Sequence, residues 1–484
     1  MRGTTSLNLS FRRNLFTRWR QASNRHYAEC SKRLLLNDLF KRRIASPLLG
    51  LLLLLYTTSS HAQQLAFPGA EGFGRFTSGG RGGEVLAVTN LNDDGEGSFR
   101  AAIAAQGART IVFRVSGTLV LQSELRITNG DLTIAGQTAP GDGVCIRDYP
   151  LIIAADNVII RYLRVRLGDV RRLQEDAVSC LGRKNLILDH CSLSWGIDEV
   201  ASFYDNENAT VQWCIVSESL DSSFHKKGKH GYGGIWGGKG ASFHHNLFAH
   251  HANRNPRFNG SRTHGKPEEE LVDFRNNVIY NWRDNSSYGG EAGRHNLVAN
   301  YFKHGPATGA TKNRIVEPYD ASGKWFVADN FVEGFAEITA NNWAGGVQGK
   351  FSKAGRVDAP HAFAPITTHT AEQAYELVLA NAGAVLPKRD AIDTRIITEV
   401  QNGIATVGNA GIINSQTEVG GWPELHSTLA PKDEDRDGMP DDWEREHGLD
   451  PSNPKDRNED FNGDGYSNLE DYLNTLPQRA SRGF

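Results

Sequence analysis

Short runs rich in β-branched and aromatic residues recur through the middle of the chain. Aligned on the fifth residue of each unit, the marker positions are Leu163, Cys191, Cys214, Asn246, Asn277, Asn300 and Asn330, with gaps of 28, 23, 32, 31, 23 and 30 residues. A period of about 20–35 residues with one β-rich run per unit is typical of a solenoid. No amphipathic helical run of ten or more residues lies between the units, which argues against a doubly wound α/β fold. The pattern predicts an all-β protein, a right-handed single-stranded parallel β-helix; an all-β sandwich is the alternative.

The marker positions also predict what stacks inside such a solenoid. Equivalent residues of successive coils lie above one another, so the four asparagines are expected to form a hydrogen-bonded ladder at an inner turn. Cys191 and Cys214, one coil apart, fit the same stack without a disulfide. With Cys145 and Cys180 they could instead make two disulfides in an oxidising compartment. The stacking favours four buried, unbonded cysteines.

Two segments look separate from the repeat. Residues 66–115 resemble a cap with one helical patch near 98–105. Residues 365–383 predict a helix, with Thr370 as N-cap and Gln373 three residues later completing a capping box. We interpret this helix as a terminal cap that protects a sheet edge from aggregation.

Charge divides the 484-residue chain into regions. The net charge of −3 combines +9 in residues 1–62, −10 in 431–474 and +2 in 475–484, which leaves −4 for 63–430. No global basic field is present to bind nucleic acid. With 39% apolar and 23% charged residues, the chain is neither disordered nor an integral membrane protein. We predict a leader (1–62), a β-helix domain (63–430), an acidic module (431–474) and a basic tail (475–484).

The N-terminal region predicts export. A basic stretch is followed by an apolar run, residues 48–56, and then by small residues up to a plausible cleavage site between Ala62 and Gln63. The run is about half the roughly 20 residues that a membrane span needs. We therefore expect a secreted, extracellular or periplasmic protein without an integral membrane segment after cleavage; a retained anchor is the alternative.

The acidic module contains two candidate calcium loops. Residues 433–444 match the spacing of a twelve-residue loop, in which a hard cation takes oxygen ligands and Gly438 allows the sharp turn. Residues 460–471 match less well and resemble dockerin-type and thrombospondin type 3-like loops. The predicted ligands are Asp433, Asp435, Asp437, Asp441 and Glu444 in the first loop and Asp460, Asn462, Asp464 and Asp471 in the second. The expected role is structural, with a solvated acidic linker as the alternative.

Polar chemistry concentrates between residues 175 and 257, where carboxylates, lysines and arginines follow successive predicted strands. Coils about 4.8 Å apart would bring equivalent positions together on one face. Carboxylates can hold a hard metal, and lysine and arginine can hold an anionic substrate. We interpret His190 as a turn or core residue, leave Trp195, Trp213 and Trp236 open between core and sugar platform, and find no zinc-like spacing among the histidines.

Several motifs together resemble polysaccharide lyase family 1, the pectate lyases, in their secreted bacterial form. These are the opening Ala66–Arg75, the glycine-rich 79–83, the stretch 88–100, the Asp-His-Cys strand at 185–194 and Arg254-Asn-Pro256. The resemblance covers roughly residues 66–340. It implies a calcium-dependent, monomeric lyase that cleaves an acidic polysaccharide, pectate (polygalacturonate), by β-elimination.

The resemblance also implies residue roles. Asp176 and Asp198 would hold calcium, and Arg254 would remove the proton at C5 of the sugar. Lys229 would bind substrate, with Lys227 as an alternative. The sequence departs from the family twice: Ser202 stands at a carboxylate position, for which Glu199 is the candidate substitute, and Asn259 stands at a second arginine position, for which Arg257 is the candidate substitute.

Two rival functions use the same residues. A hydrolase needs two carboxylates flanking the scissile bond, about 5–9 Å apart. Asp198 and Glu199 are adjacent and would point to opposite faces of a strand, which disfavours that reading. A non-catalytic carbohydrate-binding β-helix would explain the fold, but not an arginine in the same array as carboxylates and lysines.

Overall fold

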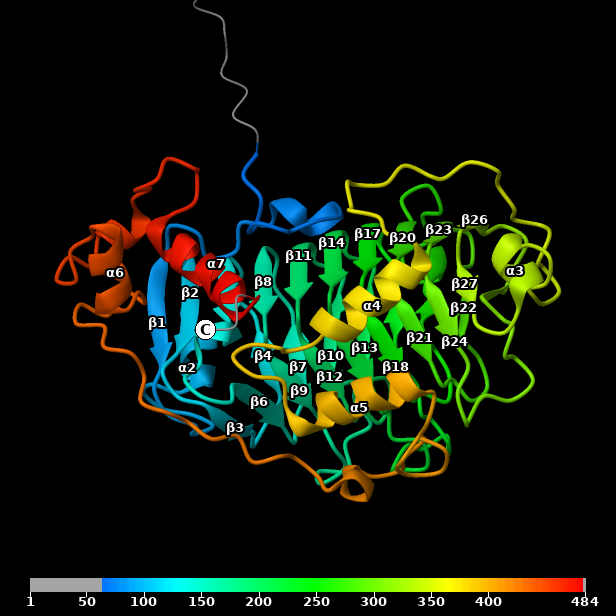
Figure 1. The fold of residues 1–484 in the computed structure, drawn as a ribbon, viewed down its shortest axis with the longest axis horizontal. Helices are drawn as coiled ribbons and strands as arrows, with labels where there is room; N and C mark the ends of the chain where they lie inside the picture. The colour runs from blue at the N-terminus through cyan, green and yellow to red at the C-terminus, as the bar shows by residue number, and fades with distance from the viewer. Residues whose placement is uncertain (1–62, 482–484) are drawn as a thin grey trace, which may run out of the picture. The chain divides into compact units, whose positions relative to one another are not determined.

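The computed structural model describes residues 63–481, so the expected leader at 1–62 lies outside the described residues. In the described part the chain winds through three parallel sheets, one strand of each sheet per coil (Figure 1). Apart from the first two strands, which pair with each other in one sheet, sequential strands belong to different sheets, and each pairs with the equivalent strand of the neighbouring coils. This arrangement confirms the predicted parallel β-helix.

The ten-strand sheet runs the length of the solenoid. Its first two strands, β1 and β2, lie within residues 66–115, so the expectation that this segment stands outside the repeat is wrong. Its helical patch is confirmed as α2 (Phe99–Ala104), capped by the Ser98 side chain. In spatial order the strands are β1 (Glu84–Val88), β2 (Arg109–Phe113), β5 (Leu132–Ala135), β8 (Val158–Arg161), β11 (Lys184–Asp189), β14 (Glu207–Gln212), β17 (Lys239–His244), β20 (Leu271–Arg275), β23 (Arg294–Val298) and β26 (Lys324–Ala328).

The other two sheets complete each coil. The nine-strand sheet contains β3 (Gly117–Val120), β6 (Val144–Arg147), β9 (Arg164–Arg166), β12 (Ser192–Ser194), β15 (Ile215–Ser217), β18 (Leu247–Ala249), β21 (Val278–Tyr280), β24 (Tyr301–Lys303) and β27 (Phe331–Val332). The eight-strand sheet contains β4 (Leu125–Ile127), β7 (Leu151–Ile153), β10 (Val178–Leu181), β13 (Ala201–Tyr204), β16 (Ile235–Trp236), β19 (Arg257–Phe258), β22 (Ser287–Gly289) and β25 (Val316–Pro318).

Alternate residues of each strand point into the solenoid and form columns of like side chains. The register pairs Ile160 with Leu188, Leu188 with Val211, and Val211 with Phe243. These residues are at most 1% exposed and belong to one apolar core that runs through the coils. Each coil therefore buries its own apolar face by stacking, without a covering layer of helices between repeats.

The predicted asparagine ladder is present. The backbone N–H of Asn246 donates to Asn277 Oδ1 at 3.0 Å, and the pattern repeats from Asn277 to Asn300 and from Asn300 to Asn330, each at 2.9 Å. Each side-chain amide also donates to a carbonyl of a neighbouring coil, so the turn leaves no buried backbone group unpaired at these positions. The ladder ends on Asn342, outside the predicted repeat.

The residue before each marker takes a left-handed conformation, as at His190 and Trp213. His190 stacks between Tyr162 and Trp213, which confirms it as a turn residue. Trp195 and Trp236 are fully buried core residues. Cys145, Cys180, Cys191 and Cys214 are all buried and unbonded, as favoured from the stacking.

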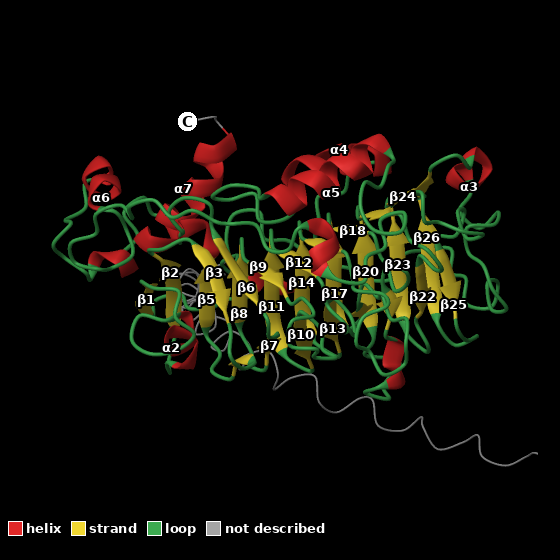
Figure 2. Ribbon diagram, turned by 90° about the horizontal axis from the view of Figure 1, so that it is seen from below, coloured by secondary structure: helices red, strands yellow, loops and turns green. Residues whose placement is uncertain are grey.

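After the last strand the chain returns along the solenoid. The predicted helix is α4 (Ala371–Asn381), with the Thr370–Gln373 capping box in place, but it does not cap an end. It lies with α5 (Ala391–Asn402) against the outside of the nine-strand sheet, where both bury apolar residues on Ile215, Leu247 and Val278 (Figure 2). The remaining helices are η1 (Phe73–Phe76), η2 (Gly136–Thr138), η3 (Gly260–Arg262), α3 (Ala336–Ala340), η4 (Gln416–Val419), α6 (Asp441–His447), η5 (Asp456–Asn458) and α7 (Asn468–Ser481).

The acidic module packs near the first coils. Met439, Trp443, Leu469, Tyr472 and Leu473 bury their side chains together with Ala135 of β5. Helix α7 runs across the predicted boundary at residue 474 and continues through most of the basic tail. No helix among residues 63–481 is both long enough and apolar enough to cross a membrane.

Candidate active site

The candidate site forms just before strands of the eight-strand sheet on consecutive coils. Asp176 precedes β10, Glu199 precedes β13 and Arg254 precedes β19. Parallel bridges join Glu199 to Tyr232 and Tyr232 to Asn253, which fixes these positions one above the other. Residues separated by 23 to 78 positions in the sequence thus share one surface of the solenoid, because the coil geometry repeats.

Three carboxylates meet at this surface. One oxygen from each of Asp176, Asp198 and Glu199 lies within 4.8 Å of the others. The Glu199 backbone N–H donates to Asp176 Oδ1 at 2.9 Å, which holds the two coils in register. The expectation that Asp198 and Glu199 point to opposite faces is wrong, because both lie in the turn before β13 and not within a strand.

Arg254 joins the carboxylates from the side. Its guanidinium forms an ion pair with Glu199, lies over the Tyr232 ring at 4.6 Å from the centroid, and donates from Nε to the Tyr288 hydroxyl at 3.3 Å. The Arg254 side chain is 19% exposed. Protein contacts therefore hold the guanidinium in place, while part of the side chain faces solvent.

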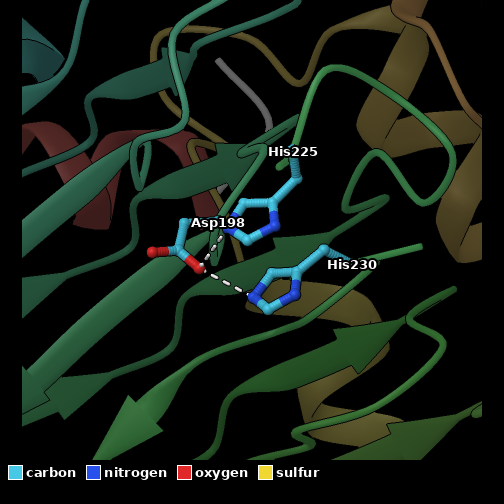
Figure 3. A group of neighbouring side chains, drawn as sticks. All are labelled: Asp198, His225 and His230. Carbon is cyan, nitrogen blue, oxygen red and sulfur yellow. Dashed lines mark ion pairs between the residues drawn. The ribbon is translucent and has the colours of Figure 1, made fainter. Parts of the chain in front are cut away.

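Two histidines complete the cluster (Figure 3): His230, which belongs to the polar stretch 175–257 singled out from the sequence, and His225, which was not singled out. His230 Nε2 lies 2.7 Å and His225 Nε2 3.4 Å from the same oxygen of Asp198, and their rings stack at 3.8 Å. His225 Nδ1 accepts the Lys227 backbone N–H, so the neutral ring carries its proton on Nε2 and faces Asp198 as a donor. The pair contacts one oxygen of Asp198 from the side of the loop, and the three side chains also form a group whose ligand atoms lie within 4.8 Å of one another and could hold a metal ion. In the sequence, the one feature that could have pointed to them is that they flank the lysines of this loop.

The pKa values of Asp176 and Asp198 are shifted in opposite directions. Burial, reinforced by the charges of Asp198 and Glu175, raises the pKa of Asp176 to about 8 against the opposing effects of Ser202 and Arg254. Burial would also raise the pKa of Asp198, but the hydrogen bond and charge of His230, and then His225, lower it. Without a cation the site thus favours a proton on one carboxylate, which is what close carboxylates do when no positive charge balances them.

This donor set fits a hard divalent cation. Three carboxylates from adjacent coils offer oxygen ligands. Arg254 already pairs with Oε1 of Glu199. Ser202, which stands where the resemblance implies a carboxylate, is buried in β13, and Glu199 is the third carboxylate that reaches the cluster.

The predicted substrate-binding residues lie in two environments. Lys227 and Lys229 are exposed on the loop that carries His225 and His230. Arg257 is buried and forms an ion pair with Glu291, so its charge is already matched. Arg262, which the sequence analysis missed, is exposed nearby; burial of part of its side chain and the charges of Arg257 and Arg254 lower its pKa.

Comparison with known proteins identifies the family. No family model matches the chain. A probable pectate lyase C of Aspergillus flavus is 35% identical over 448 residues, which cover 90% of this chain and 98% of the relative. The corresponding protein of Emericella nidulans is 35% identical over 439 residues, covering 89% and 97%. The chain belongs to the pectate lyase family.

Pectate lyases are polysaccharide lyases, so the chain is an enzyme of that class. The two relatives named above are fungal, and they do not support the expected bacterial type. Among solved structures, a Bacillus subtilis pectate lyase mutant covers 67% of this chain and 99% of its own, with a TM-score of 0.46 and 14% identity.

The two segments predicted to be calcium loops are only partly as expected. In the first loop Asp433, Asp435 and Asp437 converge, and Asp437 and Glu444 also meet Asp456. Asp441 turns away from this cluster. In the second loop Asp460 accepts three backbone N–H groups, while Asn462 donates to Asp464 and Asp471; its carboxylates are not among the converging groups of the described residues.

Proposed function

We propose that the chain is a secreted, calcium-dependent pectate lyase that cleaves 4-linked galacturonan by β-elimination. The observation that carries the proposal is the meeting of Asp176, Asp198 and Glu199 with Arg254 on one surface of the solenoid. Membership in the pectate lyase family supports the reaction class. The leader pattern before Gln63 supports export, and the enzyme is proposed to act as a monomer.

Asp176, Asp198 and Glu199 would hold the calcium ion, and His225 and His230 orient Asp198 and keep it ionised. When bound, calcium would neutralise the uronate carboxylate and so acidify the proton at C5. Three carboxylates that meet at one point can bind a cation. A hydrolase instead needs carboxylates on two sides of the glycosidic bond, so the arrangement fits a hydrolase less well.

Arg254 is proposed as the base. It would take the C5 proton; the C5–H electrons form the C4–C5 double bond, and the C4–O bond breaks with its electron pair going to the leaving oxygen, which takes a proton from solvent water. A guanidinium ordinarily keeps its proton. The alternative is that Arg254 stays charged and stabilises the enolate-like intermediate electrostatically.

The substrate is proposed to lie across Lys227 and Lys229, whose exposed charges can pair with uronate groups. Arg257 serves less well in this role because Glu291 already neutralises it. The exposed Arg262, which shares its surroundings with Arg254 and Arg257, is the better candidate for the second arginine.

The test is the ultraviolet absorbance of polygalacturonate mixed with the protein from Gln63 onward, with calcium and then with chelator. An unsaturated product absorbs and a hydrolysis product does not. We expect calcium-dependent absorbance that falls by about three orders of magnitude or more in Arg254→Ala, in the range for loss of a proton-transfer group.

The matched control is Arg356→Ala, an exposed arginine paired with Asp358 near the last strand, which should keep full activity. New reducing ends without absorbance would replace the lyase by a hydrolase. Binding of polygalacturonate by the folded protein without either signal would make it a carbohydrate-binding protein.

A further inference from the structure

The acidic module contains a buried carboxylate cluster that the catalytic proposal does not use. Asp437, Glu444 and Asp456 are 1%, 0% and 4% exposed, and one oxygen of each lies within 4.8 Å of the others. Asp437 also belongs to a second such group with Asp433 and Asp435. Six oxygens have no hydrogen-bond donor: Asp433 Oδ1, Asp435 Oδ2, Asp437 Oδ2, Glu444 Oε1, Glu444 Oε2 and Asp456 Oδ1.

Such a cluster is costly unless something positive fills it. A buried carboxylate without a partner loses its hydration, and its neighbours repel it. Arg114 pairs with Asp433 at 3.0 Å but leaves the other carboxylates unmatched. A hard divalent cation takes six to eight oxygen ligands, which this arrangement can supply.

The structure selects a ligand that the sequence motif does not contain. Asp441 occupies the ninth position of the loop, but its carboxylate contacts Lys432 at 2.8 Å and Arg445 at 3.2 Å, and it accepts the Glu434 backbone N–H. Asp456 reaches the cluster from η5, twelve residues after the loop ends. Its Oδ2 accepts the Asp450 N–H, which leaves Oδ1 free toward Asp437 and Glu444.

The cluster is tied to the solenoid. Arg114, directly after β2, donates to both Asp433 and the Pro431 carbonyl. Between the loop ligands, Met439 and Trp443 pack with Ala135, and Val85 of β1 packs against the same apolar group. The same segment therefore supplies the proposed ligands and the contact with the first coils, so ordering the loop also stabilises that contact.

We propose that a calcium-class divalent cation binds Asp433, Asp435, Asp437, Glu444 and Asp456, and that this ion fastens the acidic module to the first coils of the solenoid. The site is separate from the candidate active site and does not depend on the proposed catalysis. Its role is structural, because Asp437, Glu444 and Asp456 are buried and because Met439 and Trp443, between the ligands, pack on the first coils.

The test is terbium luminescence of the protein from Gln63 onward, excited through tryptophan. Trp443 precedes the ligand Glu444 and is 3% exposed, so it is placed to transfer energy to the ion. We expect a saturable signal that calcium displaces. Asp456→Asn should weaken binding about tenfold or more, by analogy with the loss of one charged ligand. Asp441→Asn, the matched control within the same module, should leave it unchanged.

Trp443→Phe should abolish the signal while calcium still raises the midpoint of thermal unfolding, which separates this site from any terbium bound near Asp198. Asp456→Asn should remove that calcium-dependent rise. Loss of binding in Asp441→Asn with retention in Asp456→Asn would overturn the ligand assignment. A folded protein with neither luminescence nor a thermal shift would overturn the site, whether or not it cleaves polygalacturonate.

Discussion

At the scale of single residues, the candidate site depends on which side chains can bring an oxygen atom to the carboxylate cluster. Glu199 reaches the carboxylate cluster from the turn before β13, whereas Ser202, three residues later, is buried within the strand. His230 and His225 both face one oxygen of Asp198, which leaves its other oxygen for a ligand. Glu199 can therefore replace a carboxylate at position 202, because the turn before β13 directs its side chain to the carboxylate cluster.

This assignment predicts that Glu199→Gln raises the calcium concentration needed for half-maximal lyase activity. We expect an increase of about tenfold or more, because one of three charged ligands is lost. The measurement is initial absorbance rate against free calcium. Glu207→Gln, at an exposed glutamate paired with Lys184, should not change the calcium dependence. An unchanged calcium requirement in Glu199→Gln would remove Glu199 from the metal site.

At the scale of elements, helix α5 is held by buried charge as well as by apolar contacts. Arg166 pairs with Asp390 and Asp393 at the start of the helix, at 3.0 and 2.9 Å. Near its end Glu399 contacts His250 at 3.0 Å. Removing one partner of a buried pair is destabilising even where the pair itself adds little, because the other charge is left unmatched.

The second prediction concerns the pH dependence of this contact. Burial would raise the pKa of Glu399, but the hydrogen bond and charge of His250 outweigh it and lower that pKa to about 2. A depressed folded-state pKa stabilises the protein above the ordinary value of about 4.3, and the contribution is lost as pH falls toward 2.

Glu399→Gln should therefore destabilise the protein by about 3 kcal/mol at neutral pH. The difference from the unmodified protein should shrink below about pH 4.3. Thermal or denaturant unfolding at several pH values measures it. Glu376→Gln, at an exposed position of α4, should cost little at any pH. A constant difference across the pH range would contradict the proposed role of the Glu399 charge.

At the scale of the whole molecule, charge is segregated and not merely balanced. The region 63–430 has a net charge of −4, yet an exposed lysine loop lies beside the candidate active site. The acidic charge is concentrated in the module that packs on the first coils. We therefore expect an anionic polysaccharide to be attracted locally, by Lys227 and Lys229, and not by the field of the protein as a whole.

We accordingly predict that the double variant Lys227→Ala/Lys229→Ala raises KM for polygalacturonate about threefold to tenfold with little change in kcat. Added salt should raise KM of the unmodified enzyme and narrow its difference from the double variant, because exposed charges are screened. Lys350→Ala, at an exposed lysine distant in sequence from the site, is the control. A double variant with unchanged KM at low salt would contradict substrate binding by the lysine loop.

The sequence by itself determined the features that follow from local spacing. The recurrence of β-rich runs gave the solenoid, the marker asparagines gave the ladder, and Thr370 with Gln373 gave the start of α4. The convergence of Asp176, Asp198 and Arg254 was also predictable, because coils of a solenoid bring equivalent positions together whatever the loop lengths between them.

Only the tertiary structure decided contacts made by irregular segments. The side of the solenoid that α4 covers depends on apolar faces presented by strands far earlier in the sequence. The histidine contacts with Asp198 depend on the path of a loop, and the choice of Asp456 over Asp441 depends on a turn outside the motif and on the competing charges of Lys432 and Arg445. No periodicity specifies such a path, because it is set by packing and charge between residues distant in sequence.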